Sequence, residues 1–186
     1  MKIKVGISNR HVHLNNDDYK ALFGDIPLTK RNDLNQPGMY ACNETVTIKG
    51  EKRSYDNVRV LGPLRSYTQV EVSKTDAYYL GVNPPVRNSG DLDGAYPITI
   101  IGPCGEITRN AAIIATRHIH VDKNIRKEYN LEGIEKVSVK IFGEKSGIID
   151  NVYLKDSDEA YFEIHLDTDD GNAFLLKQDD EVEIIK

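Results

Sequence analysis

An arginine followed by a His-x-His pair occurs twice in this chain, once near its beginning and once past its middle. The two copies read Asn9-Arg10-His11-Val12-His13-Leu14 and Thr116-Arg117-His118-Ile119-His120-Val121. Each copy directly follows a hydrophobic strand pattern, and each precedes a short helical pattern with an acidic start. The repeat therefore predicts two related half-structures, each of which places the same motif at the end of a strand.

Most of the chain around these copies has the pattern of short strands. Apolar or β-branched residues alternate over short runs, and turn-forming residues bound most of them. The runs span residues 3–7, 45–49, 57–61, 67–72, 97–101, 111–115, 136–142, 148–154, 160–166 and 181–185. So many short strands predict a mostly β fold with a β-barrel-like architecture, in place of an alternating α/β fold.

Helical patterns are few and short. They span residues 16–23, 74–80 and 123–129, and a further helical turn is expected near Thr168. Asn16, Ser73 and Asp122 are the expected N-caps, because their side chains can accept a hydrogen bond from the first turn. Long loops are expected over residues 24–43 and 82–96, where turn-forming residues are frequent or periodicity is weak.

Composition limits the compartment and the partners. A formal net charge of −5 argues against nucleic acid as the main partner, although a few cations could still hold a small phosphorylated ligand. No run approaches the roughly 18 apolar residues that cross a bilayer, and the N-terminus lacks the apolar core of a secretion signal. Cys42 and Cys104 are too few for a disulfide framework. We therefore expect a cytoplasmic protein without a membrane partner.

The five histidines point to metal binding. Four of them form the two pairs, and the fifth, His165, lies in another strand pattern. Residues i and i+2 of a strand face the same side, so both imidazoles of a pair can reach one ion. Zinc and similar divalent ions suit imidazole ligands. The alternative, ordinary half-buried histidines, would have to explain why the pair occurs twice after an arginine.

Neutral imidazoles alone leave a dication poorly compensated, so a carboxylate ligand is expected as well. Glu71 is the best candidate, because it lies between two valines of a strand pattern where an unpaired charge would be costly. The alternative is a solvent-facing position on an amphipathic strand.

Several cations precede Glu71 in the chain. Arg59 interrupts an apolar strand, and Arg65 follows a Gly-Pro-Leu turn. The alternative is that these are surface cations, which for Lys52 alone is the simpler interpretation. A guanidinium can hold a phosphate oxyanion through two parallel hydrogen bonds, which makes Arg65 the candidate for phosphate binding.

Five separated motifs run through essentially the whole chain in a fixed order. They occupy residues 7–14, 62–71, 85–91, 117–120 and 165–169. In this order the chain resembles the PduL-type phosphotransacylases, also called phosphate propanoyltransferases. The resemblance implies two closely packed β-barrel-like domains capped by short helices. Residues 1–8 plus 118–186 would form one domain, and residues 9–117 the other.

The resemblance also implies ligands for two zinc ions per chain. One ion would be held by His11, His13 and Glu71, and the other by His118, His120 and His165. Arg65 would be the catalytic, phosphate-contacting arginine. The positions associated with coenzyme A are Ser8, Asn9, Arg10, Lys52, Arg59 and Asn172. Asp170-Gly171 departs from the Glu-Ala expected there, outside the metal ligands.

The activity implied is the interconversion of a short-chain acyl-CoA and phosphate with an acyl phosphate and CoA. Because the residues show no supported catalytic triad, we expect direct attack by phosphate in place of a covalent acyl-enzyme. Propanoyl and acetyl groups differ by one methylene, so the residues do not fix the chain length. Family members are typically homodimers. Members of microcompartments carry an amphipathic extension before the first strand, and here that strand starts at residue 2 or 3, so encapsulation is not expected. The alternatives are a metal-dependent hydrolase and a non-catalytic zinc- or acyl-CoA-binding module.

Overall fold

The structure, a computed structural model, describes residues 1–157 and 161–185. The chain divides into two compact units, which we describe separately: Met1–Asn9 with Thr116–Lys186, and Arg10–Ala115. These boundaries lie within two residues of those expected from the sequence. That each unit is a domain folding on its own stays a prediction.

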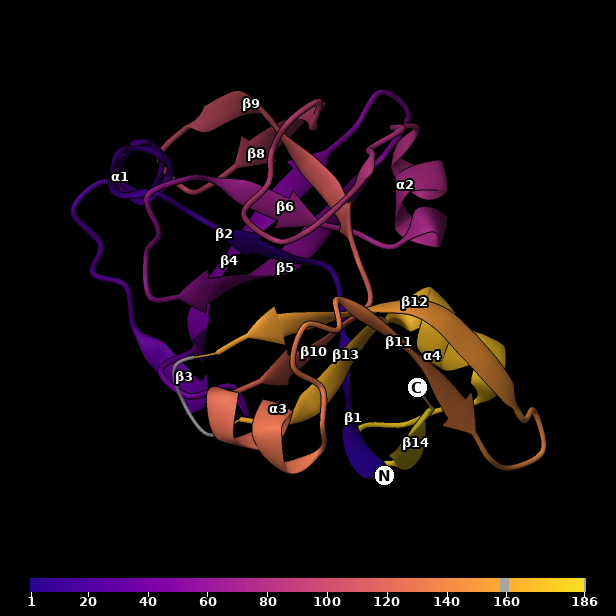
Figure 1. Ribbon diagram of the computed structural model, residues 1–186. Coiled ribbons are helices and arrows are strands. Elements are labelled where there is room, and N and C mark those ends of the chain that lie inside the picture. Colours follow the sequence, from indigo (N-terminus) through magenta and orange to yellow (C-terminus); the bar gives the residue numbers. More distant parts are fainter. Residues whose placement is uncertain (158–160, 186) are drawn as a thin grey trace. The chain divides into compact units, whose positions relative to one another are not determined.

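The first unit is a closed barrel. Its strands are β1 (Lys2–Ser8), β10 (His118–Val121), β11 (Lys136–Ile141), β12 (Gly147–Asp156), β13 (Glu163–Asp167) and β14 (Glu181–Ile185). Around the barrel they follow the order β1-β13-β10-β12-β11-β14. Strand β1 pairs in parallel with β13 and antiparallel with β14, so the first strand of the chain joins the C-terminal half (Figure 1).

The second unit closes in the same manner. Its strands are β2 (His11–His13), β3 (Lys30–Asp33), β4 (Tyr40–Lys49), β5 (Ser54–Gly62), β6 (Gln69–Glu71), β7 (Val86–Arg87), β8 (Tyr96–Ile101) and β9 (Glu106–Ala115). The order is β4-β5-β2-β6-β9, and β8 pairs with both β9 and β4 and so completes the ring. Two further strands pair with members of this ring: β3 is antiparallel to β4, and β7 is parallel to β9.

The two barrels have one topology. Strands β2, β4, β5, β6, β8 and β9 correspond in order to β10, β11, β12, β13, β14 and β1. In each barrel the His-x-His strand is parallel to one neighbour and antiparallel to the other. The antiparallel neighbour is in turn parallel to the next strand. The mostly β fold with two barrels is thereby confirmed, and the repeated motif occupies the same strand in both.

Four short helices occur in the described residues, also in matching places. Helices α1 (Asn16–Phe23) and α3 (Lys123–Glu128) follow the His-x-His strands, while α2 (Lys74–Leu80) and α4 (Thr168–Phe174) follow β6 and β13. None of them is long and apolar enough to cross a membrane. Each begins with a side chain that accepts a backbone hydrogen bond from the first turn, and these N-caps are Asn15, Ser73, Asp122 and Asp167.

Each barrel has its own apolar core, built by strands that bury alternate residues. In β5 the buried residues include Val58 and Val60, and in β11 they are Val137, Val139 and Ile141. Burying a side chain of this size stabilises the fold by about 1.5–3 kcal/mol. Alternation also turns the residues between these to the other face of the sheet, which leaves that face for polar groups.

Some expectations were wrong in detail. The N-cap of α1 is Asn15 and not Asn16, because Asn15 Oδ1 accepts from the Asp18 amide at 2.7 Å. The expected loop 24–43 contains β3 and the start of β4, and the loop 82–96 contains β7. The strand expected over 160–166 begins at Glu163, and residue 160 lies outside the described residues.

Candidate metal centres

The first cluster of candidate ligands lies on β2 and β6. The antiparallel register places His11 opposite Glu71 and His13 opposite Gln69. The two histidines are two residues apart on one strand, and their ring centroids are 5.0 Å apart. Glu71 Oε2 lies 3.5 Å from His11 Nε2. One ligand atom each from His11, His13 and Glu71 all lie within 4.8 Å of one another, so the three can hold one ion.

Hydrogen bonds fix the carboxylate of Glu71. Its Oε1 accepts from Gln69 Nε2 at 2.6 Å and from Ser89 Oγ at 2.9 Å. Gln69 is in turn held by the Gly90 amide, which donates to its Oε1 at 2.8 Å. These bonds occupy one carboxylate oxygen and leave Oε2 beside His11.

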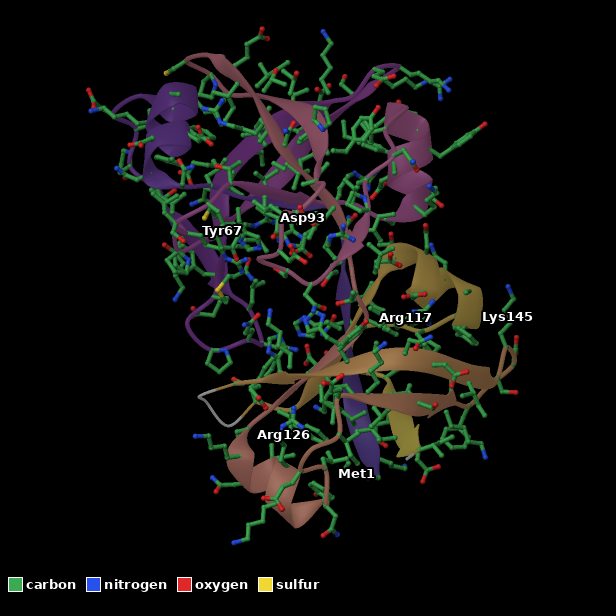
Figure 2. The ribbon with its side chains drawn as sticks, turned by 45° about the horizontal axis from the view of Figure 1, so that its top comes forward. Met1, Tyr67, Asp93, Arg117, Arg126 and Lys145 are labelled. Atoms are coloured by element: carbon green, nitrogen blue, oxygen red, sulfur yellow. The ribbon has the colours of Figure 1, made fainter. Side chains whose placement is uncertain are left out.

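Arg65 is tied to this cluster through Ser89. Its amide donates to the Leu14 carbonyl at 2.9 Å, which places the residue beside the end of β2. Its Nη1 donates to the Tyr67 hydroxyl at 2.9 Å and reaches Ser89 Oγ at 3.4 Å; Tyr67 is labelled in Figure 2. The guanidinium is therefore one side chain away from Glu71.

The surroundings of the first cluster favour the protonation states that bind a metal ion: a neutral imidazole and an ionised carboxylate. Burial, assisted by the nearby His11 and Arg65, lowers the pKa of His13 well below its usual value, so its imidazole is neutral. Burial alone would raise the pKa of Glu71, but the adjacent His11 outweighs it and holds that pKa well below the usual range. Moreover, His13 Nδ1 is buried with no hydrogen-bond partner among the described residues. A buried polar atom without a partner is costly, and a metal ion would satisfy it.

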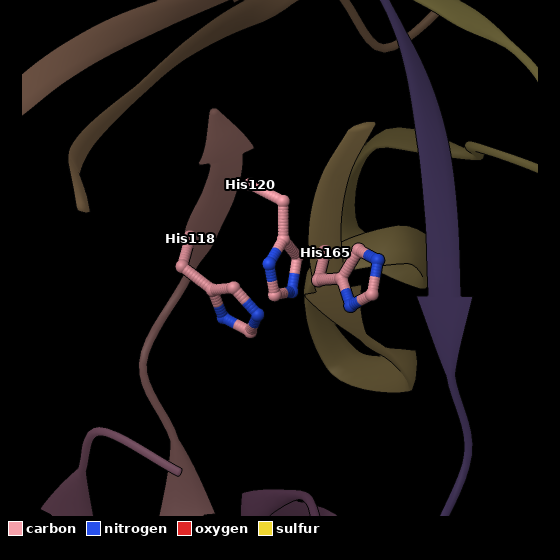
Figure 3. Close-up of side chains that lie close together, drawn as sticks. All are labelled: His118, His120 and His165. Carbon is pink, nitrogen blue, oxygen red and sulfur yellow. The ribbon is translucent and has the colours of Figure 1, made fainter. Parts of the chain in front are cut away.

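The second cluster lies on β10 and β13. The antiparallel register places His118 opposite His165 and His120 opposite Glu163. Ligand atoms of His118, His120 and His165 all lie within 4.8 Å of one another. Figure 3 shows the three imidazoles with one nitrogen of each ring turned toward the other two rings. No other group of three or more such ligands occurs in residues 1–157 and 161–185.

Outer partners orient two of these rings. His118 Nδ1 lies 2.9 Å from the Thr116 carbonyl, which leaves its other nitrogen for the centre of the cluster. His165 Nε2 lies 2.8 Å from the Tyr161 hydroxyl and 3.4 Å from Glu163 Oε1. The Tyr161 hydroxyl also donates to Glu163 Oε1 at 2.7 Å. Carbonyl and carboxylate partners of this kind are typical of histidines that bind metals.

The pKa of His120 is lowered to about 3, mainly by burial and to a smaller extent by the nearby His118 and His165. The residue is therefore a neutral imidazole near neutral pH, as a metal ligand must be. Burial and the hydrogen bond to Glu163 raise the pKa of Tyr161, which keeps its proton. Imidazole and carboxylate ligands in sets of three suit zinc and related divalent ions.

The arginine of each repeated motif has the same structural role. Arg10 Nη1 lies 3.2 Å from Asp76 Oδ1, and Arg117 holds Asp170 through two hydrogen bonds of 2.7 and 2.8 Å. Both aspartates are the third residue of the helix that follows the third ligand. Arg117 is labelled in Figure 2. The arginines therefore anchor helices α2 and α4 beside the two clusters.

The positions that the family resemblance associates with coenzyme A occur in both units. Ser8 and Asn9 lie at and just after the end of β1, and Asn172 lies in α4. In the other unit, the Arg10 guanidinium also lies 3.9 Å from the centroid of the Tyr55 ring. Arg59 Nη1 donates to the carbonyls of Cys42 and Asn43, and Lys52 Nζ lies 5.9 Å from the Tyr78 ring centroid.

The sequence did not predict the residues that hydrogen-bond to the candidate ligands or to the two motif arginines. They are Gln69 and Ser89 in one cluster, Tyr161 and Glu163 in the other, and the aspartates that hold the two motif arginines. A signal for two of them was present: Gln69 and Glu163 each precede a ligand by two residues on a strand and therefore share its face. Ser89 and Tyr161 lie outside the strands, where no periodicity marks them.

Comparison with known proteins shows that the chain is similar over most of its length to one family. The family model of the phosphate propanoyltransferases matches residues 4–177. The chain is 47% identical over 187 residues to the phosphate propanoyltransferase of Thermotoga maritima, covering 99% of this chain and 89% of that protein. It is 43% identical to the enzyme of the same name from Rhodopseudomonas palustris, covering 100% and 83%. For that of Salmonella typhimurium the identity is 43%, over 92% and 82%. On the evidence of these matches, the chain, which has two barrels of one topology and a cluster of candidate metal ligands in each, belongs to the phosphate propanoyltransferase family of acyltransferases.

Proposed function

We propose that this enzyme transfers a short acyl group, propanoyl or acetyl, between coenzyme A and inorganic phosphate, using two zinc ions per chain. The observation that carries the proposal is the pair of ligand clusters, one of which is connected to Arg65 through Ser89. The family membership supports the reaction class.

The residues of both clusters fit a zinc ion. His11, His13 and Glu71 would hold one, and His118, His120 and His165 the other. The unpartnered His13 Nδ1 supports the first assignment, and the neutral His120 imidazole supports the second. When bound, zinc supplies Lewis acidity toward the thioester carbonyl and the departing thiolate.

Arg65 would hold the phosphate. Its guanidinium is positioned by Tyr67 and Ser89 and is half-buried, so it can offer fixed donors to an oxyanion. Phosphate is a weak nucleophile approaching a substrate that already carries several negative charges. A fixed cation offsets this repulsion and holds the attacking oxygen in place.

The transfer would proceed by direct attack. A phosphate oxygen bonds to the thioester carbonyl carbon, the carbon–sulfur bond breaks, and the CoA thiolate leaves with the bonding electrons. Burial raises the pKa of the Cys42 thiol to about 11, which keeps this cysteine from acting as a thiolate near neutral pH. This supports a mechanism without an acyl-cysteine at that residue.

Coenzyme A would contact Ser8, Asn9, Arg10, Lys52, Arg59 and Asn172, and the enzyme would be a cytoplasmic homodimer. Free thiols at Cys42 and Cys104 suit a reducing compartment. Sedimentation of the purified protein tests the dimer.

The function is tested with purified protein of measured zinc content, incubated with acetyl-, propanoyl- and longer acyl-CoAs. We expect CoA release that depends on phosphate, with one acyl phosphate formed per CoA. CoA release without phosphate, yielding the free acid, would identify a hydrolase. Acyl-CoA binding without turnover, in the presence of bound zinc and phosphate, would identify a binding module.

A further inference from the structure

A tyrosine and a glutamate lie directly behind one histidine of the second cluster. Tyr161 and Glu163 are both buried, with 8% and 6% of their surface exposed. The Tyr161 hydroxyl lies between Glu163 Oε1 at 2.7 Å and His165 Nε2 at 2.8 Å. The arrangement is a chain of three polar groups that ends on a ring nitrogen.

The chemistry of these groups gives the chain one direction. A carboxylate only accepts hydrogen bonds, and a tyrosine hydroxyl has a single proton to donate. Tyr161 donates that proton to Glu163, so its oxygen is left to accept a hydrogen bond from His165. His165 must then carry its proton on Nε2, and the lone pair of the neutral ring lies on Nδ1.

The orientation of the ring agrees with this assignment. Because His165 Nε2 contacts Tyr161, the nitrogen left for the cluster is Nδ1. In Figure 3 one nitrogen of His165 is turned toward His118 and His120 while the other is turned away from both. The nitrogen that carries the lone pair is therefore the one that faces the other two ligands.

The backbone leaves room for this arrangement at Gly6. Strand β1 pairs Gly6 with His165, and a β-carbon at Gly6 would collide with Glu163 Oε1. A side chain there would displace the carboxylate from Tyr161.

The matching position of the other barrel has a related role. Gln69 stands opposite His13 as Glu163 stands opposite His120, and each precedes the third ligand by two residues. Gln69 donates to Glu71 Oε1 and so leaves Oε2 for the cluster. Both barrels thus use this position to select the ligand atom, with an amide behind a carboxylate and a carboxylate behind an imidazole.

We propose that Tyr161 and Glu163 are positioning residues that hold His165 as the Nε2-protonated tautomer and present its Nδ1 to a metal ion. Neither residue contacts substrate in this role. The inference rests on the proposed zinc site, but not on acyl transfer, and its first test begins with the metal-free protein.

The first test is the tautomer of His165 in the metal-free protein. Long-range proton–nitrogen correlation spectra distinguish protonated, unprotonated and metal-bound ring nitrogens. The signals are assigned by their loss in His165→Gln. We expect a protonated Nε2 near neutral pH, and on zinc addition a change at Nδ1 only. A neutral ring that carries its proton on Nδ1, or zinc on Nε2, would overturn the proposal.

The second test is zinc affinity in Tyr161→Phe and Glu163→Gln. Glutamine keeps the size of Glu163 but can donate as well as accept, so it no longer fixes the tyrosine proton. Both variants are made in a His11→Ala background, which removes a ligand from the first cluster, and are titrated with zinc against a chromophoric chelator. We expect a loss of affinity of roughly tenfold to a hundredfold, the usual effect of removing an outer partner of a ligand.

Tyr153→Phe is the matched control. Tyr153 is a half-buried tyrosine of the same barrel, on β12 opposite His118, and its substitution should leave zinc affinity unchanged. If Tyr161→Phe and Glu163→Gln bind zinc as tightly as the Tyr153→Phe control and the background protein do, the positioning role is refuted. If the background protein itself binds no zinc, the metal assignment of the proposed function fails, and the metal-free spectrum still decides the tautomer. Circular dichroism identifies a variant that does not fold, in which case the other variant decides.

Discussion

His118 and His165 stand directly opposite each other on the antiparallel strands β10 and β13. His11 and Glu71 stand opposite each other in the same way on β2 and β6. In both clusters, therefore, two candidate ligands are positioned by the backbone ladder of a barrel. Removing one of these side chains should weaken binding of the proposed ion while the strands stay paired.

The first prediction concerns the histidines. His11→Ala and His118→Ala should each reduce bound zinc from two ions per chain to one and abolish most phosphate-dependent acyl transfer, because each removes a ligand from a different ion. Elemental analysis and the turnover assay measure this. Lys123→Ala, on the exposed side of α3, is the control and should change neither. A near-normal rate in either histidine variant contradicts the assignment of two ions.

The second prediction concerns Arg65. Arg65→Lys keeps the charge but loses the planar pair of donors. We expect weaker use of phosphate by roughly tenfold to a hundredfold, from the loss of about 1.5–3 kcal/mol of charge-assisted hydrogen bonding. Zinc content and the KM for acyl-CoA should stay near normal. Steady-state kinetics with each substrate varied in turn measures this.

Arg31→Lys, at an exposed position of β3, is the matched control and should leave the kinetics unchanged. If the defect of Arg65→Lys appears only in the KM for acyl-CoA, Arg65 belongs to the coenzyme A site instead.

The third prediction concerns Ser89. Its hydroxyl donates to Glu71 and lies within reach of Arg65 and Gln69. Ser89→Ala removes these contacts at once. Zinc affinity of the first cluster should fall by roughly tenfold to a hundredfold, as measured by chelator competition in a His118→Ala background. Ser66→Ala, at an exposed position of the same unit, should have no effect. Unchanged affinity in Ser89→Ala would mean that Glu71 keeps its orientation without this hydroxyl.

The fourth prediction concerns pH. Burial and neighbouring histidines lower the pKa of His120 from 6.5 to about 3 in the folded chain. Between these values the unfolded chain binds a proton that the folded chain does not. The free energy of unfolding of metal-free protein should therefore decrease as pH falls below about 6.5, by at most about 1.4 kcal/mol per pH unit from this residue.

Urea unfolding of chelator-treated protein at a series of pH values measures the slope. His120→Gln cannot take up a proton, so its stability should depend less steeply on pH. Identical slopes in the two proteins would show that His120 titrates normally in the folded state.

The barrel fold was predictable because its strands bury alternate residues, and all four N-caps carry side chains suited to that place. Two of these, Ser73 and Asp122, were predicted at the right residue. Strand β3 was not predictable by pattern, because all four of its residues are exposed and none is apolar. The shift from Asn16 to Asn15 reflects two adjacent residues of equal capping ability.

The members of each ligand cluster could be predicted from the sequence, because the residue types and spacing of the His-x-His pairs, and the place of Glu71 in an apolar strand pattern, indicate metal ligands. The groups behind them could not. Tyr161 reaches His165 from outside β13, and Ser89 reaches Glu71 from a loop. Such contacts depend on how segments meet in space, which no local spacing records.

The place of β1 in its barrel has a consequence for the order of folding. Arg10–Ala115 is continuous in the chain, so a nascent polypeptide has every strand of that barrel once residue 115 has left the ribosome. Strand β1 is made first, yet both of its partners, β13 and β14, are among the last strands synthesised. Until β13 and β14 are made, the hydrogen-bonding groups of β1 have no native partner. Closure of the barrel that contains β1 therefore joins the most distant parts of the chain. Non-local pairing of this kind slows folding and leaves an open strand edge in the meantime. Slow closure and aggregation of nascent chains should therefore concentrate in this barrel.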